Sequence, residues 1–439
     1  MAEISPYSGS VAQAAPGVYL QRVAARPGPG FTSGVPLFIG LARVRPEAGG
    51  EDGNRAMRPL RLASWDEFER GVEPTPPGRF LGYAVRGFFE NGGERCVVLP
   101  LRAREPLKGR ASSTEDGDLP EPIAALRSVF RKEGDGRGHD GLRGVLDDID
   151  DVDLVCVPDI MIEEIRRSEE SVFELQREVL EYCHDMGERF AVLDVLPAAS
   201  GDATGRIGVA VRQRQALTFA AEASADGAVY VPWVRVRSLH GAGEEWVPPS
   251  GHVAGIYARS DARVGFHKAP ANEIVEGIVD LESHISHEEQ GPLNEYGVNC
   301  LRSFPRRGIR VWGARTLSGH RQWRYVNVRR VILTIVRWIK HNMNDLVFEA
   351  NDALLWDRVR DRLSGQCYQL FERGALKGRT AEEAFFVKCD AELNPAEERE
   401  AGKVVCDIGL APLSPAEFIV MRVTQDRAMG GATVVPIRA

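Results

Sequence analysis

Short apolar runs alternate with longer helical patterns over residues 35–258, and this alternation is the strongest constraint on the fold. Charged residues, Gly or Pro bound each run; the runs are Pro36–Ile39, Cys96–Leu99, Leu154–Val157, Phe190–Leu193 and Val229–Val231. The stretch Ile162–Met186 has the apolar spacing of a helix. Short buried strands separated by helices are typical of a parallel sheet, so residues 28–255 are predicted to form an α/β domain. Its segments 104–121 and 131–141, rich in charge and glycine, are expected to be surface loops.

The pattern over residues 256–428 predicts a second unit of mixed α+β type, with helices first and strands last. One helix is expected after the candidate N-cap Asn327, with an apolar face from Val328 to Ile339. The opposite face of this helix is basic, with Arg329, Arg330, Arg337 and Lys340. Basic residues also cluster over 302–330 in a chain of net negative charge, and this cluster could face an acidic partner. An extended piece, Trp323–Val326, is expected just before the helix.

A second helix and a small sheet are expected next. Asn351 and Asp352 can cap the helix and Gly374 can end it, while Thr380 and Glu383 fit a capping box for a short turn. Three strands are predicted, with the second helix lying across them: Ala384–Cys389, Val404–Leu410 and Phe418–Thr424.

Composition and charge exclude several classes of function. The formal net charge of −8 on 439 residues disfavours a general nucleic-acid binder. Seven cysteines stand singly without a CxxC pair, which indicates a reducing compartment and neither a disulfide framework nor a four-cysteine zinc site. The first residues lack a signal peptide and no apolar run is long enough to span a bilayer. A soluble chain made in the cytoplasm, without membrane contact of its own, is expected.

Motifs for catalysis or cofactor binding are weak. The GxGxxG match at 136–141 lacks the preceding strand that a dinucleotide site needs, and a solvated loop explains it better. His284 and His287 offer only two zinc ligands, and the acidic run 147–153 lacks the glycine and glutamate of an EF-hand loop. No GxSxG or GxxxxGK[ST] occurs. No catalytic residue, cofactor or metal is therefore predicted.

Several phrases, in a fixed order, resemble those of contractile tail sheath proteins, the subunits that surround the inner tube of myophage tails, R-type bacteriocins and phage-tail-like injection systems. The phrases are Pro16–Tyr19, Gly34–Pro36, Pro248–Arg259, Lys268–Glu273, Leu293–Asn299, Gly308–Arg330, Val347–Asp352, Glu382–Asp390 and Pro415–Phe418. The resemblance covers residues 240–425 closely and residues 1–240 only at scattered points.

The resemblance implies a division of the chain and a set of contact residues. Residues 1–27 and 429–439 would be extended arms that add strands to sheets of neighbouring subunits, with 28–255 as an outer domain and 256–428 as an inner domain facing the tube. The expected arm residues are Val18, Tyr19, Leu20, Val23, Val434, Val435 and Ile437. Charged residues of the second helix and its exit are expected to face the tube: Asp357, Arg358, Arg360, Asp361, Arg362, Arg373 and Lys377. An ordinary solvated face is the alternative for this second set.

The function implied by the resemblance is structural. The subunit would polymerise as a helical lattice around a tube and contract to drive it through a target envelope, after assembly in the cytoplasm. Expected partners are further copies of the chain, an inner tube protein, baseplate proteins and a tail-terminator or cap protein. Two alternatives stay open: an α/β enzyme, such as a hydrolase whose site is assembled only on folding, and a tube or baseplate component of the same machines.

Overall fold

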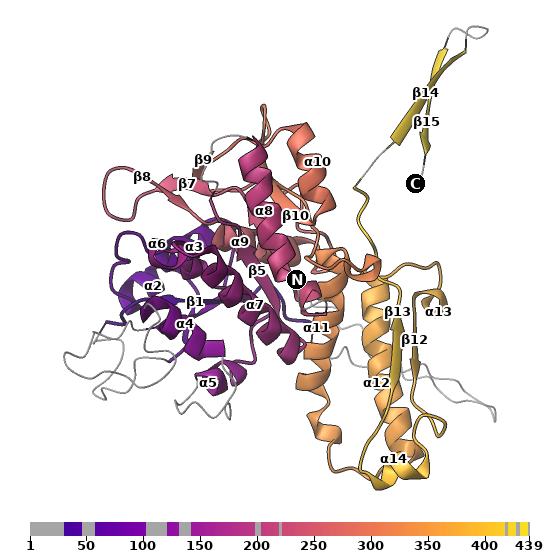
Figure 1. Cartoon of the computed structure of the whole chain (residues 1–439). Coiled ribbons are helices and arrows are strands. Elements are labelled where there is room, and N and C mark those ends of the chain that lie inside the picture. The colour runs from indigo at the N-terminus through magenta and orange to yellow at the C-terminus, as the bar shows by residue number, and fades with distance from the viewer. Residues whose placement is uncertain are drawn as a thin grey trace, which may run out of the picture.

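The protein has two structural parts and a separate C-terminal hairpin (Figure 1). The structure is a computed structural model, and it describes residues 30–45, 58–101, 121–130, 142–197, 203–218, 222–417, 420–426 and 431–437. The expected N-terminal arm residues Val18, Tyr19, Leu20 and Val23 lie outside this description, as do the loops expected at 104–121, apart from Glu121, and at 131–141.

One eight-stranded sheet organises the larger part, in the order β11-β10-β6-β5-β4-β1-β3-β2. Its strands are β1 (Pro36–Leu41), β2 (Leu60–Leu62), β3 (Cys96–Leu101), β4 (Leu154–Cys156), β5 (Phe190–Asp194), β6 (Gly227–Val231), β10 (Val298–Phe304) and β11 (Gly308–Trp312). The six inner strands run parallel, and the edge strands β2 and β11 are antiparallel to their neighbours. All five apolar runs form inner strands, which confirms the predicted α/β class.

Helices cover both faces of this sheet. They are α2 (Trp65–Gly71), α3 (Leu81–Glu90), α4 (Glu121–Phe130), α5 (Arg143–Asp147), α6 (Glu163–Arg166), α7 (Glu169–Met186), α8 (Ala203–Leu217), α9 (Ser250–Arg263) and α10 (His287–Glu295). The connection β1 to β3 and the connection β4 to β5 move in opposite directions across the sheet. Because such crossovers are right-handed, α3 and α7 lie on opposite faces. The single helix expected over 162–186 is two helices, because Ser168 caps a new start at Glu169.

Helices α3 and α9 cross in direct backbone contact. A Cβ atom on Gly251 would lie 2.3 Å from the Ala84 backbone, and one on Gly255 would lie 2.4 Å from the carbonyl oxygen of Phe88. The phrase Pro248–Arg259 therefore owes its two glycines to close helix packing. A small antiparallel sheet lies beside this domain, in the order β8-β7-β9. Its strands are β7 (Val234–Arg237), β8 (Glu244–Val247) and β9 (Ile278–Leu281).

The second part is a helical unit with a two-stranded sheet. It contains α11 (Val326–Asn342), α12 (Ala353–Glu372), α13 (Ala381–Ala384), β12 (Phe385–Lys388), α14 (Ala396–Glu400) and β13 (Asp407–Leu410). Figure 1 shows α11 and α12 as two long neighbouring helices, with β12 and β13 running beside α12. Asp352 accepts hydrogen bonds from the amides of Leu354 and Leu355, and Gly374 has the left-handed φ of 71° that follows a helix end. Both predicted ends of the second helix are thereby confirmed.

Four local predictions in this region are wrong. The strand expected over Phe418–Thr424 does not join the sheet beside α12, because residues 420–426 pair with residues 431–437 instead. Tyr325, not Asn327, is the N-cap of α11, and Asn327 is buried. Arg321–Trp323 forms a short 3₁₀ turn at the start of the expected extended piece Trp323–Val326. The Glu383 carboxylate accepts from the amide of Arg379 instead of closing a capping box with Thr380.

Two features of the structure concern the expected domain boundary at residue 255 and the expected C-terminal arm at residues 429–439. Residue 255 lies within α9, and β10 and β11, which follow it, belong to the large sheet. The last described strands, β14 (Val420–Asp426) and β15 (Gly431–Ile437), pair with each other as an antiparallel hairpin. In Figure 1 this hairpin stands apart from the rest of the protein.

Candidate functional site

The crevice where an open α/β sheet commonly binds a ligand is occupied by a side chain of the protein itself. The chain leaves β1 toward β3 and later returns to β4 on the other side of β1, so the carboxyl ends of β1 and β4 form a topological switch point. Asp159, fully buried just after β4, accepts hydrogen bonds there from the amides of Leu41, Phe80 and Leu81. Its carboxylate thus lies at the N-terminus of α3, where an α/β enzyme would hold a phosphate.

A second carboxylate fills the equivalent position at β5. Asp194, the last residue of β5, accepts from the amide of Ser250 at 2.7 Å and from its hydroxyl at 2.6 Å, at the start of α9. Burial raises the pKa of Asp194 to about 7, and the hydrogen bonds from Ser250 oppose that rise. Both acids therefore act as internal helix caps.

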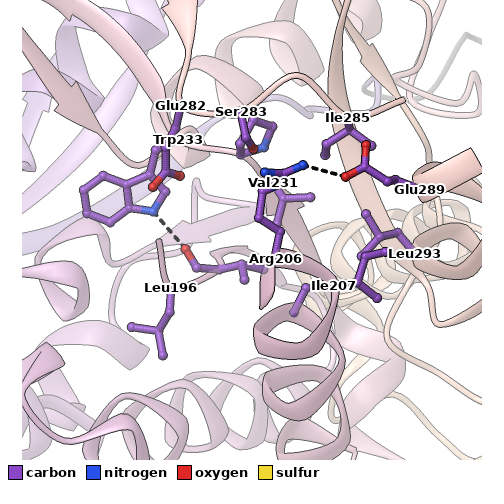
Figure 2. Close-up of a pocket in the computed structure, with 13 residues that line it drawn as sticks. Leu196, Arg206, Ile207, Val231, Trp233, Glu282, Ser283, Ile285, Glu289 and Leu293 are labelled. Atoms are coloured by element: carbon purple, nitrogen blue, oxygen red, sulfur yellow. Dashed lines mark hydrogen bonds and ion pairs between the residues drawn. The ribbon is translucent and has the colours of Figure 1, made fainter. Parts of the chain in front are cut away.

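A cavity lies beside the carboxyl ends of β5 and β6, and it is small (Figure 2). It is lined by Trp233, Leu196 and Ile207, with the Arg206–Glu289 ion pair of 2.6 Å closing one side. The indole nitrogen of Trp233 donates to the carbonyl of Val195. The volume of about 30 Å³ has room for one or two water molecules but not for an organic substrate.

The described residues contain no group of three or more His, Cys, Asp or Glu side chains placed to hold a metal ion. Across the same ranges, no helix has the length and apolarity needed to cross a bilayer.

Helix α11 is fixed to the sheet domain by a buried ionic cluster, which we call the Arg330 cluster: Arg330, Asp153 and Asp261. The Arg330 guanidinium bonds Asp261 at 2.9 and 2.5 Å and Asp153 at 3.0 Å. The side chains of Arg330 and Asp261 are each 2% exposed. Burial alone would lower the pKa of Arg330, but the two carboxylates offset this and hold it above its usual range.

The other basic residues of α11 face the same domain. Arg329 forms two bonds, of 2.6 and 3.1 Å, with Asp226, which is fully buried. Arg337 donates to the carbonyls of Thr32 and Glu188, and Lys340 donates to that of Met186. Within the basic cluster of residues 302–330, for which an acidic partner was considered, Arg329 and Arg330 therefore bind acids of their own chain. Helical spacing identified the basic face of α11, but nothing in the sequence showed which acids would cover it.

The segment leading to the C-terminal hairpin is held by a second ion pair, which sequence reasoning missed. The Arg315 guanidinium binds Glu417 through two hydrogen bonds, one of 2.8 Å, and also donates to the carbonyl of Asn294 at 2.8 Å. The amide of Asn327 donates to the carbonyls of His267 and Leu413, both at 2.8 Å. These bonds attach the segment 411–417 to Arg315 of the sheet domain and to α11, immediately before the hairpin.

The expected C-terminal arm residues lie in β15. Val434, Val435 and Ile437 pair in register with Val423, Arg422 and Val420 of β14. The arm thus forms a hairpin within its own chain here.

The expected tube-facing residues lie on the outer side of α12 and beyond its end. Among the expected residues that form ion pairs, Asp361 has the most exposed side chain, at 79%. Arg373 and Lys377 are also exposed. Arg358 pairs with Glu349, Arg362 pairs with Asp345, and Arg360 pairs with Asp357. The structure therefore brings most of these residues together as a surface of alternating charge.

Comparison with known proteins gives one consistent result. The family model described as the phage tail sheath protein central domain matches residues 144–317, and the model for the phage tail sheath C-terminal domain matches residues 319–426. A prophage major tail sheath protein of Pseudomonas aeruginosa is 28% identical over 174 residues, and the tail sheath protein of Burkholderia phage BcepMu is 28% identical over 196 residues. Those matches cover 39% and 42% of this chain, and 44% and 40% of the relatives. The chain thus spans less than half the length of these curated relatives.

Solved structures match over nearly the whole chain. The helical sheath of the anti-feeding prophage in its contracted state is 31% identical, with a TM-score of 0.67 over 94% of this chain and 99% of that one. The contracted sheath complex of an extracellular contractile injection system, PVC, is 27% identical, with a TM-score of 0.66 over 95% of this chain and 99% of that one.

Proposed function

Since this chain belongs to the phage tail sheath protein family, we propose that it is the structural subunit of a contractile sheath, polymerising as a helical lattice around an inner tube. The observation that carries the proposal is the match to a contracted helical sheath over 94% of the chain at 31% identity. The occupied switch-point crevice supports it, because Asp159 fills the position that an enzyme's ligand would need.

Lattice contacts are proposed to form through the terminal strands. An isolated two-stranded hairpin is marginally stable in water, and both its edges carry unpaired backbone groups. Pairing with strands of a neighbouring copy would satisfy those groups. The Arg315–Glu417 pair supports this role because it anchors the chain one residue before Phe418, so tension on the hairpin passes to the sheet domain. Residues 1–27 are proposed to add the other strand.

Contraction is proposed to move subunits as rigid bodies. The Arg330 cluster and the Arg329–Asp226 pair join α11 to the sheet domain through bonds that are shielded from water. Such a joint resists shear between the two parts, so the lattice would rearrange at the strand contacts between subunits. We place the boundary between the parts near residue 318, where the two family models also meet.

The outer face of α12 is proposed to contact the tube through Arg358, Arg360, Asp361, Arg362, Arg373 and Lys377. Exposed ion pairs of this kind are individually weak, which suits a surface that must release the tube during contraction. Baseplate and cap proteins are the proposed end partners, with assembly in the cytoplasm before the particle is used.

The proposal is tested by polymerisation of the purified full-length chain. Sedimentation at moderate salt should separate a high-mass polymer, and deleting residues 418–439 should leave a folded monomer. The matched control is Arg167→Gln, which changes an exposed pair outside the proposed contacts and should leave sedimentation unchanged. A full-length chain that stays monomeric under all these conditions would contradict the lattice proposal.

A further inference from the structure

Two cysteines lie opposite each other at one end of the β12–β13 sheet. The last pair of this antiparallel ladder is Lys388 with Asp407, and the next step along the same register brings Cys389 opposite Cys406. Residues directly opposite in an antiparallel pair point to the same face. Here it is the face of Val387 and Ile408, which packs in the hydrophobic cluster beneath α12.

The spacing of such a pair suits a disulfide. Opposed residues in antiparallel strands have Cα atoms about 4.5–5.5 Å apart, and disulfides need about 4.4–6.8 Å. The thiols also act directly on each other: burial raises the pKa of Cys406 to about 12, and the neighbouring Cys389 thiol adds to that rise. Both cysteines are free in this structure.

The segment between the two cysteines forms a loop, and hydrogen bonds close this loop at its base, next to the two thiols. Asn394 accepts from the amide of Val405 at 2.7 Å and donates to the carbonyl of the same residue at 2.9 Å. The Cys389 thiol donates to that carbonyl at 3.5 Å. Residues 390–405, which include α14, therefore form a loop that polar hydrogen bonds close beside the two thiols.

This loop contacts the connection between α11 and α12. The amide of Asn351 donates to the carbonyl of Lys403 at 2.7 Å, and Figure 1 shows α14 at the end of the helical unit away from the hairpin. A disulfide between Cys389 and Cys406 would fix the loop 390–405 to β12 and β13 and so stabilise this end of the helical unit.

Exposure decides which thiol meets an oxidant first. All seven cysteines lie in the described ranges, and Cys406 alone among them is partly exposed. Cys389 is 1% exposed, and Cys367 on α12, the third thiol of this region, is 2% exposed. An oxidant from solution therefore reaches Cys406, and Cys389 stands ready as the resolving thiol.

We propose that Cys389 and Cys406 form an intramolecular disulfide when the protein meets an oxidised low-molecular-weight thiol, such as oxidised glutathione. The Cys406 thiolate attacks one glutathione sulfur, breaks the glutathione disulfide and releases one reduced glutathione. The Cys389 thiolate then attacks the Cys406 sulfur, forms the Cys389–Cys406 bond and displaces the second glutathione. The two protons lost by the cysteines are taken up by the two glutathione thiolates, so atoms and electrons balance.

The link acts as a staple that forms after the protein leaves a reducing compartment. The raised pKa of Cys406 keeps the thiolate scarce at neutral pH, so oxidation is slow and the reduced form persists during assembly. Because both cysteines belong to one chain, this chemistry does not require polymerisation. Its failure would leave the proposed sheath function untouched.

The test uses the full-length chain incubated with oxidised glutathione at mildly alkaline pH, then alkylated, digested and mapped by mass spectrometry. We expect a peptide that joins Cys389 to Cys406 and the loss of two free thiols per chain. Closing this short loop should raise the thermal unfolding midpoint by on the order of 5 °C, and dithiothreitol should reverse the shift.

Matched variants identify the pair. Cys406→Ser should abolish the linked peptide and the shift, while Cys367→Ala should keep both. The proposal is overturned if glutathione stays attached to Cys406, if Cys406 links to Cys367, or if every thiol remains free. The wild-type measurements decide between these outcomes even where a variant folds poorly.

Discussion

Replacing Arg330 by Met tests how the two parts of the subunit are joined. The variant removes the shared cation from two buried carboxylates, Asp153 and Asp261. Asp153 keeps hydrogen bonds from the amides of Gly34 and Val35, so the loss falls mainly on Asp261. Leaving a buried ion without its partner costs about 3–5 kcal/mol, and we expect the free energy of unfolding to fall by that amount.

The assay is urea unfolding of the monomer fraction, followed by tryptophan fluorescence. Arg362→Gln is the control, because its partner Asp345 is 61% exposed and an ion pair so open to water contributes little to stability. Adding Asp261→Asn to Arg330→Met should recover part of the loss, since it removes the uncompensated charge. A loss for Arg330→Met no larger than that of the control would refute the reasoning.

The same variant should respond to pH in a defined direction. Burial raises the pKa of Asp261 above its usual value of 3.8 even with Arg330 present. A raised folded-state pKa means that the native state binds the proton more tightly, so stability is highest below the unfolded value and falls as pH rises through the folded one. Without Arg330 the pKa of Asp261 rises further, and the defect should shrink as the pH is lowered.

Three further predictions follow from named contacts. Asp194→Asn should flatten the pH dependence of stability between pH about 4 and about 7. Burial raises the pKa of Asp194 to about 7, so wild-type stability falls as the pH rises through that window. Thermal unfolding across a pH series measures the difference. Gly251→Ala should lower the unfolding free energy by about 1–3 kcal/mol by forcing α9 away from Ala84, whereas Gly365→Ala, with open space around it on α12, should raise it by about 0.5–1 kcal/mol. Arg315→Gln should reduce polymer yield in sedimentation without the stability loss of Arg330→Met, because its bonds to Glu417 hold only the segment before the hairpin; an unchanged yield would contradict the anchoring role.

The repeating elements of the fold could be predicted from the sequence. Short apolar runs such as Phe190–Leu193 can be buried on both sides only as inner strands, and all of them are. Asp352 and Gly374 mark the ends of α12 through local hydrogen bonding and backbone preference, so sequence alone located them. Local chemistry was sufficient wherever the nearest neighbours determined the conformation.

Contacts between residues far apart in the sequence could not be predicted from local patterns. Arg330 follows Arg329 in the sequence and looks equally exposed, yet it meets Asp153 and Asp261 from distant parts of the chain. Asn327 has the ordinary features of an N-cap but is buried to bind the segment at Leu413. Asp159 is an isolated acid in the sequence, and only the strand order places it at the start of α3. Each depends on tertiary contacts that no single stretch reveals.

Electron cryo-microscopy of the assembled full-length chain tests the sheath account most directly. The account predicts hollow tubes of uniform width in which β14 and β15 of each subunit pair with strands of a neighbouring copy. It also predicts that deleting residues 418–439 abolishes the tubes. A polymer whose hairpin contacts no neighbour, or a chain that forms no tubes at all, would contradict it.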